Sequence, residues 1–385
     1  MDSRAGRLLI DGSFVPGRVV FDGGRIVRVE EDPAPGAEEL PIVAPGLVDL
    51  HVHGFGGHEP LDDLGAMAGA LARAGTTAFL PTLFPRAPEP LGEDAEAVWS
   101  AARELGGRVP GLHLEGPFVN PEAIGGLPPD GVFEPSPEAL RAILGSASGD
   151  GRGVRAMTLA PELAGGGALI DELVRAGVRV SLGHSLARTA EAWDAVRRGA
   201  TGATHLFNAM RPLHHREAGI VGVALTADEL VVEIIGDLTH VGPEAFELAL
   251  RARGPEGLCL VSDMLAGAGT DARRLSSDAP ARFCSHGREC FVADGAAWYE
   301  DPDAPDGRRL TGSVTCQLEA VRGLVARGIV APADALRMAS ETPARALGVE
   351  AELGRITPGA RADLLVLAGP DLELVEVLVG GEPLA

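Results

Sequence analysis

The chain has 385 residues, 45% of them hydrophobic, which is enough for one large domain with a buried core and a smaller second domain. Its formal net charge of −22 argues against nucleic acid or an anionic membrane surface as a partner. The sequence contains no lysine, which excludes a Schiff-base lysine, a P-loop lysine and a carbamylated lysine that bridges two metals.

The two ends of the chain predict short β-strands joined by tight turns. Apolar runs near the N-terminus are separated by Asp-Gly and Gly-Gly pairs, which are typical of β-hairpins. The runs are Leu8–Ile10, Val19–Phe21 and Ile26–Val29, and similar runs near the C-terminus are Ala362–Leu367 and Val377–Val379. We expect residues 1–45 and 356–385 to form one small β-sandwich domain.

Between the two ends the pattern of strand, loop and helix repeats. The predicted strands are Leu47–His53, Thr76–Leu80, Leu112–Glu115, Ala156–Leu159, Val178–His184, Ala203–His205, Val231–Asp237 and Leu258–Asp263. The predicted helices between them include Leu64–Ala74, Ala95–Leu105, Leu169–Ala176 and Thr189–Arg198. Eight apolar strands that alternate with helices predict a (β/α)₈ TIM barrel over residues 46–355. The alternative, an open doubly wound sheet, would need a nucleotide-binding turn, and Gly54–Gly57 lacks the G-x-G-x-x-G spacing.

Polar side chains end most of the predicted barrel strands, where barrel enzymes place their active sites. They are His51, His53, Glu115, His184, His205, Asp237 and Asp263. His51 and His53 are two residues apart in a strand, so both point to the same face. Imidazole and carboxylate together suit Zn²⁺, Fe²⁺ or Mn²⁺, and a catalytic site keeps one position open for water. The pattern therefore predicts a metal site at the barrel mouth.

Each of these residues also has a purely structural interpretation. A single histidine at a strand end is more often a hydrogen-bonded core residue, and Glu115 alone could pair with an arginine. Asp263 could cap the helix that follows it, although a general base is favoured because the site otherwise lacks a residue for proton transfer. His113 is expected in the core or behind the ligands. His58, His214, His215 and His286 are expected in loops.

Several segments together carry a resemblance to a known family. They are Pro45–Gly54, Gly111–Pro121, Leu182–Ser185, Thr204–Met210, Arg216–Gly219, His240–Val241, Val261–Asp263, Gly312–Ser313, Thr342–Gly348 and Gly354–Leu364. In this order, and over nearly the whole chain, they resemble the N-acetylglucosamine-6-phosphate deacetylase family of the amidohydrolase superfamily. The stretches H-L-E-G-P-F and H-L-F-N-A-M are the most specific.

The resemblance implies that Glu115, His184 and His205 hold a catalytic metal and that Asp263 is the general base and acid. His51 and His53 would hold a second ion, with Glu115 as the bridge because no lysine is present. One or two ions are expected, with Zn²⁺ preferred over Fe²⁺ or Mn²⁺. The implied reaction is attack of a metal-bound hydroxide on the acetamide of N-acetyl-D-glucosamine 6-phosphate, releasing D-glucosamine 6-phosphate and acetate in amino-sugar catabolism.

The family also implies where the sugar phosphate binds. The expected contacts are Asn208, Ala209, Arg216, His240, Gly312 and Ser313. Arg216 and His240 would supply the cationic pocket that a phosphate needs in so acidic a chain. The structural alternatives are an ion pair between Arg216 and Glu217, and a loop position for His240.

The sequence departs from the family at Leu127, which stands where the family has a histidine that contacts the substrate. Leucine can neither donate a hydrogen bond nor carry a charge, which leaves N-acetylgalactosamine 6-phosphate or another N-acyl compound as alternative substrates. A non-catalytic binding relative of the same fold is the third hypothesis. The polar, turn-rich stretch 271–309 has no assigned role.

The partner and compartment are also expectations. Four cysteines without a C-x-x-C pair, no signal peptide and no long apolar run indicate a reduced, soluble, cytoplasmic protein. The resemblance implies a homodimer.

Overall fold

The computed structural model describes residues 1–32, 39–145, 153–270 and 281–384. Its centre is an eight-stranded sheet in which neighbouring strands are parallel and follow chain order. The strands are β5 (Leu47–Val52), β6 (Thr76–Leu83), β7 (Leu112–Glu115), β8 (Val154–Leu159), β9 (Arg179–Leu182), β10 (Gly202–Ala203), β11 (Val231–Ile235) and β12 (Leu258–Val261). The predicted (β/α)₈ barrel is confirmed, with several strands ending one or two residues earlier than expected.

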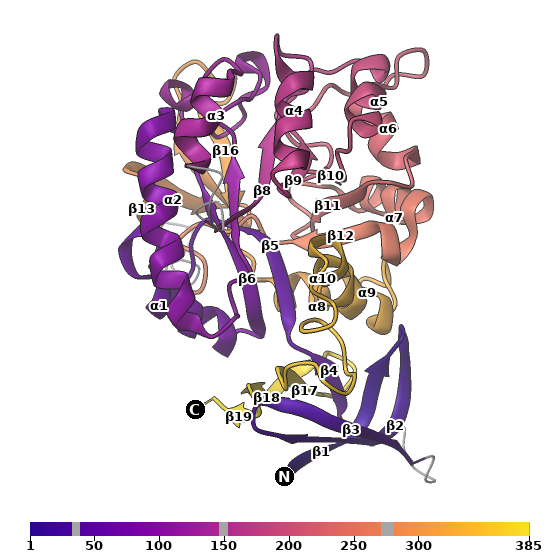
Figure 1. The fold of residues 1–385 in the computed structure, drawn as a ribbon. Helices are drawn as coiled ribbons and strands as arrows, with labels where there is room; N and C mark the ends of the chain where they lie inside the picture. Colours follow the sequence, from indigo (N-terminus) through magenta and orange to yellow (C-terminus); the bar gives the residue numbers. More distant parts are fainter. Residues whose placement is uncertain (33–38, 146–152, 271–280, 385) are drawn as a thin grey trace.

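Helices surround this sheet on its outer side (Figure 1). They are α1 (Pro60–Arg73), α2 (Pro88–Ala102), α3 (Pro137–Leu144), α4 (Gly166–Arg175), α5 (Thr189–Arg197), α6 (Gly219–Thr226), α7 (Pro243–Gly257), α8 (Gln317–Ala326), α9 (Pro332–Met338) and α10 (Glu341–Leu347). In α1 the buried residues Leu64, Met67, Ala68 and Leu71 follow the three- and four-residue spacing of one helix face. None of the helices in the described ranges is long and apolar enough to cross a membrane.

The first and last barrel strands meet through a short seam. The backbone N–H of Asp263 donates to the carbonyl of His51 at 2.9 Å, and Val52 forms a parallel bridge with Met264. Further down the seam, the buried amide of Gln317 donates to the carbonyls of Val48 and Leu260, at 2.8 Å each. One side chain therefore replaces the backbone ladder where β5 and β12 do not pair directly.

Both chain ends contribute to a second, seven-stranded sheet. Its order is β19-β18-β17-β4-β1-β2-β3, with bounds β1 (Asp2–Ile10), β2 (Ser13–Asp22), β3 (Arg25–Glu31), β4 (Ile42–Pro45), β17 (Leu364–Ala368), β18 (Glu373–Val379) and β19 (Glu382–Pro383). In Figure 1 this sheet lies below the barrel, with both termini at that end. The expected meeting of the two ends in a small β domain is confirmed.

The small sheet has an apolar core of its own. Residues from both ends of the chain pack in it, among them Leu8, Phe21, Ile26, Leu364 and Leu378. The chain leaves this sheet at the end of β4 and enters the barrel at β5, with one glycine between them. We therefore propose 1–45 with 356–385, and 46–355, as the limits of the two domains.

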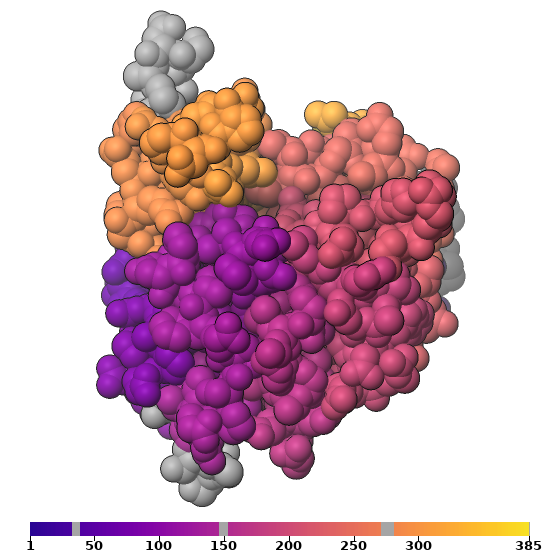
Figure 2. Space-filling model, turned by 90° about the horizontal axis from the view of Figure 1, so that it is seen from above, coloured from indigo at the N-terminus to yellow at the C-terminus, as the bar shows by residue number. Residues whose placement is uncertain are grey.

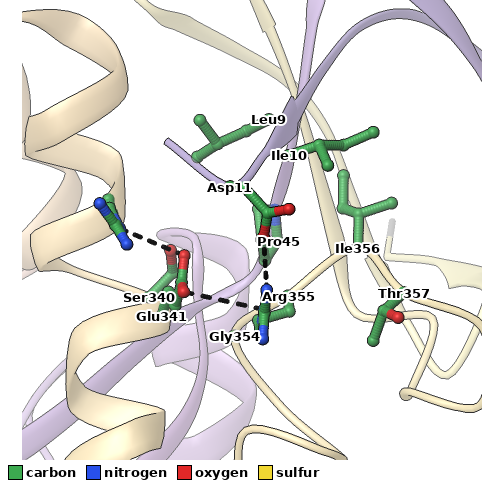
Figure 3. A pocket seen from close by; sticks show the side chains of 11 residues that line it. Leu9, Ile10, Asp11, Pro45, Ser340, Glu341, Gly354, Arg355, Ile356 and Thr357 are labelled. Carbon is green, nitrogen blue, oxygen red and sulfur yellow. Dashed lines mark hydrogen bonds and ion pairs between the residues drawn. The ribbon is translucent and has the colours of Figure 1, made fainter. Parts of the chain in front are cut away.

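A cavity of about 100 Å³ lies where the small sheet meets the barrel (Figure 3). Arg355 reaches Asp11 on one side and lies 3.8 Å from Glu341 on the other, and Glu341 also faces Arg337 at 3.3 Å. The two arginines and the two carboxylates thus neutralise one another. They form an ionic contact between the domains at the wall of this cavity.

A third sheet occupies part of the stretch 271–309, for which no role was predicted. Residues 271–280 lie outside the described residues. After them come four antiparallel strands, β13 (Arg282–Ser285), β14 (Arg288–Ala293), β15 (Ala296–Glu300) and β16 (Arg308–Ser313). Viewed from above, this orange sheet lies beside the purple and red segments of the barrel (Figure 2).

Candidate active site

The residues predicted to bind metal lie together at the carboxyl ends of the barrel strands. His51 lies in β5 and His53 follows its end, while Glu115 is the last residue of β7. His184 and His205 each stand two residues past the end of their strands, β9 and β10. All five are buried, each with at most 3% of its surface exposed.

Glu115 is the centre of this group. Its Oε1 lies 3.0 Å from Nε2 of His184 and 3.0 Å from Nε2 of His205. Its Oε2 lies 3.1 Å from Nε2 of His53, and Nε2 of His51 is 3.4 Å from Oε1. The five side chains form two groups of three donors that share Glu115, each with all donor atoms within 4.8 Å of one another.

The hydrogen bonding of His184 shows that this donor set fits a cation. Its Nδ1 lies 3.0 Å from the carbonyl of Ala123, an acceptor, so Nδ1 carries the proton and Nε2 carries a lone pair. That lone pair points at Glu115 Oε1 and lies 3.0 Å from Nε2 of His205. Acceptors facing one another at this distance repel unless a cation lies between them. The site therefore suits a divalent metal with imidazole and carboxylate ligands.

The electrostatics of the cluster also favour positive charge. Burial by itself lowers the pKa of His51, but the carboxylates of Glu115 and Asp263 outweigh it and raise that pKa well above its usual value. Burial raises the pKa of Glu115, but the surrounding histidines reverse this and hold it well below its usual value. Glu115 is therefore ionised inside the barrel.

Asp263 lies at the open side of the cluster. Its Oδ1 is 3.5 Å from Nε2 of both His51 and His53, and 13% of its side chain is exposed. Its backbone N–H and carbonyl are both bonded, to His51 and Ser313. The carboxylate is thus held between the donor cluster and solvent, where a substrate would enter. It does not cap a helix, because none begins in the residues described directly after it.

His113 is close to the cluster but does not contribute a donor. Its two ring nitrogens contact the hydroxyls of Thr82 at 3.2 Å and Thr158 at 2.8 Å. Burial, together with neighbouring His51, lowers its pKa well below the usual value, so the ring is neutral. Its ring packs edge-on against His51, 4.7 Å between centroids. This agrees with the expected position behind the ligands.

The residues expected to contact the sugar phosphate differ in what their own groups bond to. Asn208 donates to the carbonyls of His205 and Leu206, at 3.3 Å each, and the Ala209 carbonyl accepts from Ser185. Gly312 and Ser313 end β16, and Ser313 N–H donates to the Asp263 carbonyl at 2.8 Å. A side chain at Gly312 would come within 3.0 Å of the same carbonyl, so the backbone there approaches Asp263 closely.

Arg216 is exposed and makes no ion pair with Glu217. Its guanidinium contacts the ring of His215 at 2.9 Å, whereas Glu217 binds Arg188 and Thr189. The ion pair considered as the structural alternative for Arg216 is therefore absent from the described structure, and this cation is available to a ligand.

His240 is held by Asp237, the residue predicted to end the seventh barrel strand. Nδ1 of His240 lies 2.7 Å from Oδ2 of Asp237, whose other oxygen accepts two backbone N–H groups. Burial lowers the pKa of His240, but Asp237 outweighs it and the net pKa is raised. His240 is thus a fixed imidazole with a bias toward the cationic form.

Leu127 belongs to a loop that packs on the donor cluster. The side chain is buried, with 4% of its surface exposed. A side chain placed at nearby Gly125 would come within 3.5 Å of the His184 ring. The loop that carries Leu127 therefore reaches the donor cluster through Ala123 and Gly125.

Sequence reasoning missed residues that support the site from outside. Phe84 stacks on His53 at 3.9 Å, and His286 packs on the far side of Phe84 at 4.7 Å. Glu59 accepts hydrogen bonds from the Ser285 hydroxyl at 2.7 Å and from the His286 N–H at 2.9 Å. His286 was expected in a loop, and it lies in the turn between β13 and β14, against the aromatic support of a donor.

The missed residue with the clearest sequence signal is Glu233. It is the one charged residue in the apolar strand β11. A parallel barrel strand is buried on both faces, so a carboxylate in its middle needs a partner. Here Arg179 lies 3.1 Å from it, and His51 Nδ1 lies 3.6 Å from its second oxygen.

The barrel and its donor cluster are those of an amidohydrolase. The model of the amidohydrolase family matches residues 42–384. The chain belongs to the amidohydrolase family.

Within that family, the chain resembles deacetylases of amino-sugar phosphates. It is 34% identical to human N-acetylglucosamine-6-phosphate deacetylase, covering 98% of this chain and 92% of the relative. It is 31% identical to the enzyme of that name from Bacillus subtilis strain 168, covering 95% and 92%. It is also 33% identical to N-acetylgalactosamine-6-phosphate deacetylase of Escherichia coli O157:H7, covering 94% of each chain.

A solved structure agrees with these relatives. It is an aspartate-to-alanine mutant of N-acetyl-D-glucosamine-6-phosphate deacetylase from Mycobacterium smegmatis, in complex with N-acetyl-D-glucosamine 6-phosphate. The TM-score is 0.87 at 31% identity, over 99% of this chain and 98% of that one. The resemblance carried by the sequence motifs is confirmed.

Proposed function

We propose that this protein hydrolyses the acetamide of N-acetyl-D-glucosamine 6-phosphate to D-glucosamine 6-phosphate and acetate. The observation that carries the proposal is the buried cluster around Glu115 with Asp263 at its open side. The deacetylases that this chain resembles supply the substrate class. The complete donor set argues against the alternative of a non-catalytic relative.

The donor cluster supplies the places for metal. Glu115, His184 and His205 would hold one divalent ion, and His51 and His53 would hold a second with Glu115 as the shared ligand. Zn²⁺ suits this mixture of imidazole and carboxylate, with Fe²⁺ or Mn²⁺ as the alternatives. A bound divalent cation lowers the pKa of a water that it holds and polarises an amide carbonyl.

Asp263 moves the proton. Its carboxylate takes the proton that the attacking water loses, and then gives a proton to the nitrogen as the C–N bond breaks. The acyl carbon thereby gains an oxygen and leaves as acetate, and the sugar keeps the amine. The partly exposed position of Asp263 allows both transfers, because the carboxylate faces the donor cluster and the entrance.

The phosphate would bind the cationic and N–H groups of the mouth. Arg216 offers a guanidinium that no carboxylate in the described structure neutralises, and His240 offers an imidazole held by Asp237. Asn208, Ala209, Gly312 and Ser313 would line the rest of the sugar site.

Turnover of two substrates tests the proposal. The metal-loaded protein is assayed for acetate release from N-acetylglucosamine 6-phosphate and from N-acetylgalactosamine 6-phosphate. We expect the higher kcat/KM with the first. Leu127 and the Escherichia coli relative are the reasons to include the second. No acetate from either compound would refute the proposed reaction, and a preference for the second would change its substrate.

We also propose that the protein is a cytoplasmic homodimer. Cys259, Cys284 and Cys290 form no disulfide in the described structure, as expected in a reducing compartment. Light scattering after size exclusion would give about twice the 39.7 kDa chain mass for a dimer.

A further inference from the structure

Glu233 lies in the barrel wall behind the donor cluster. It is 2% exposed, in the middle of β11. Its Oε1 lies 3.1 Å from Nη1 of Arg179, which also donates to the carbonyl of Val231 at 3.1 Å. The arginine therefore fixes one oxygen of this carboxylate, and the other oxygen points elsewhere.

The free oxygen of Glu233 faces His51. Among the described residues, neither Oε2 of Glu233 nor Nδ1 of His51 has a hydrogen-bond partner, and both atoms are buried. They lie 3.6 Å apart. A closer approach of roughly half an ångström brings them within hydrogen-bonding distance. Two unsatisfied buried atoms that face each other are each other's natural partners.

We propose that Glu233 is a positioning residue that accepts the Nδ1 proton of His51 and thereby makes Nε2 of His51 a metal ligand. A neutral imidazole carries one proton, so placing it on Nδ1 leaves the lone pair on Nε2. That Nε2 faces Glu115 at 3.4 Å and His53 at 3.2 Å, the other members of the second donor group. This inference rests on the metal site of the proposed function.

The effect of Glu233 is specific to the second donor group, which consists of His51, His53 and Glu115. His184 gains the same tautomer from the Ala123 carbonyl, and the Nδ1 atoms of His53 and His205 have no partner among the described residues. His51 is thus the metal-binding histidine of this cluster whose Nδ1 faces a carboxylate. We infer that Glu233 controls the ion at His51, His53 and Glu115, and leaves the ion at His184 and His205 unaffected.

The isosteric substitution Glu233→Gln inverts the tautomer. Arg179 can only donate, so the amide oxygen of the glutamine turns toward it and the NH₂ turns toward His51. His51 must then accept on Nδ1, and its proton moves to Nε2, where it blocks the metal. We expect at least a 10–100-fold loss of affinity for the second ion, the usual effect of losing such a partner. Metal content is measured by mass spectrometry after equilibration with Zn²⁺, and by the visible spectrum after loading with Co²⁺.

A pair of double variants distinguishes a positioning role of Glu233 from a purely structural role. Both replace the buried cation with Arg179→Met. One adds Glu233→Gln, whose amide is then free to turn its oxygen to His51. The other adds Glu233→Met, which offers no acceptor. Both lack the ion pair, so a purely structural role predicts equal metal content. We expect two ions in the first and one in the second.

A substitution far from the donor cluster serves as the control. Asp363→Asn removes a buried carboxylate from its arginine (Arg361, 2.8 Å) just before β17 and should keep both ions. Thermal melts confirm that each compared variant is folded. Equal metal content in the two double variants would overturn the inference, as would a wild-type protein that takes up one ion at saturating Zn²⁺. Neither result depends on turnover, so failure here is distinguishable from failure of the deacetylase assay.

Discussion

Three of the site residues share an unusual backbone conformation. His184, His205 and Asp263 each stand two residues past a strand end and have positive φ values of 47°, 28° and 52°. Non-glycine residues in this region cost of order 1–3 kcal/mol each and persist where the surroundings enforce them. Here the conformation places the side chain of each residue in the candidate active site. Glycine would adopt this conformation more easily, but it has no side chain that could bind a metal or a proton.

Asp263 gives the most direct residue-level prediction. Asp263→Asn keeps the shape of the side chain but cannot take up the proton of the attacking water. We expect kcat to fall by about 10²–10⁴-fold, the usual contribution of such a group, while Zn²⁺ content stays at the wild-type value. Steady-state kinetics and metal analysis on one preparation check this. A variant with wild-type kcat would remove Asp263 from the proton transfer.

The pair of Asp237 and His240 predicts a pH effect. His240 has a raised pKa in the folded protein, so its cation is lost as pH rises through that raised value, and with it go its contribution to stability and the phosphate binding that we propose for it. In Asp237→Asn the burial of His240 is no longer outweighed by this carboxylate, so the pKa of His240 falls. The decline of kcat/KM with rising pH should therefore begin at a lower pH than in the wild type. Profiles from pH 5 to 9 on the same substrate make the comparison. Superimposed profiles would contradict it.

At the scale of elements, the β13–β16 sheet depends on the loop before α1. Glu59 receives both the Ser285 hydroxyl and the His286 N–H, so one carboxylate fastens the β13–β14 turn over Phe84 and His53. The sheet is otherwise an insertion between the last barrel strand and α8. Its attachment through Glu59 therefore adds to the contacts that Arg288 makes with Gly126 and Ser313 makes with Asp263.

Removing that carboxylate should loosen the sheet selectively. For Glu59→Ala we expect the free energy of local opening to fall by about 2 kcal/mol, roughly 30-fold faster amide exchange in 282–313, with little change in the barrel strands. Hydrogen exchange with mass spectrometry measures both regions. Glu59→Gln is the control, because its oxygen still accepts, and it should show a smaller change. Uniform acceleration across the chain would argue against a local fastening.

The sequence predicted the barrel strands well because apolar runs between helices are a strong signal. It also predicted the donors, because a barrel collects strand-end residues at one mouth. β10 (Gly202–Ala203) overlaps the predicted strand Ala203–His205 at one residue, because so short a strand carries little pattern of its own. The β13–β16 sheet was missed because its strands are short, polar and half-exposed. Glu233 was missed because its role depends on which residue of another strand lies opposite it.

At the scale of the whole molecule, the two domains approach each other closely at Gly46. Gly46 lies between β4 and β5, and its N–H donates to the carbonyl of Asp363 at 2.8 Å. A β-carbon on Gly46 would come within 2.0 Å of the Thr77 hydroxyl oxygen. The small sheet is therefore held against the barrel by close backbone approach as well as by the ionic contact around Arg355.

Gly46→Ala should destabilise the whole protein. The methyl group must displace a buried threonine, and overpacking of this kind costs about 1–3 kcal/mol, a fall in Tm of roughly 1–4 °C in a chain of this length. Gly323→Ala, in α8 with nothing within 4 Å of the new methyl, is the matched control and should leave Tm unchanged or raise it. Calorimetry measures both. A Gly46→Ala protein as stable as the wild type would show that the junction yields easily.

The small sheet also sets the order in which the protein can be completed during synthesis. β4 pairs with β1 on one side and with β17 on the other, so the N-terminal strands have no partner on that edge until β17 is made. At 5–20 residues per second, a ribosome takes roughly 15–60 s to travel from β4 to β17. During that interval Leu8, Val19 and Phe21 lack the C-terminal side chains that cover them in the finished protein. The nascent chain therefore presents an apolar strand edge to chaperones while the barrel is being made, and β17 and β18 complete the sheet when they emerge.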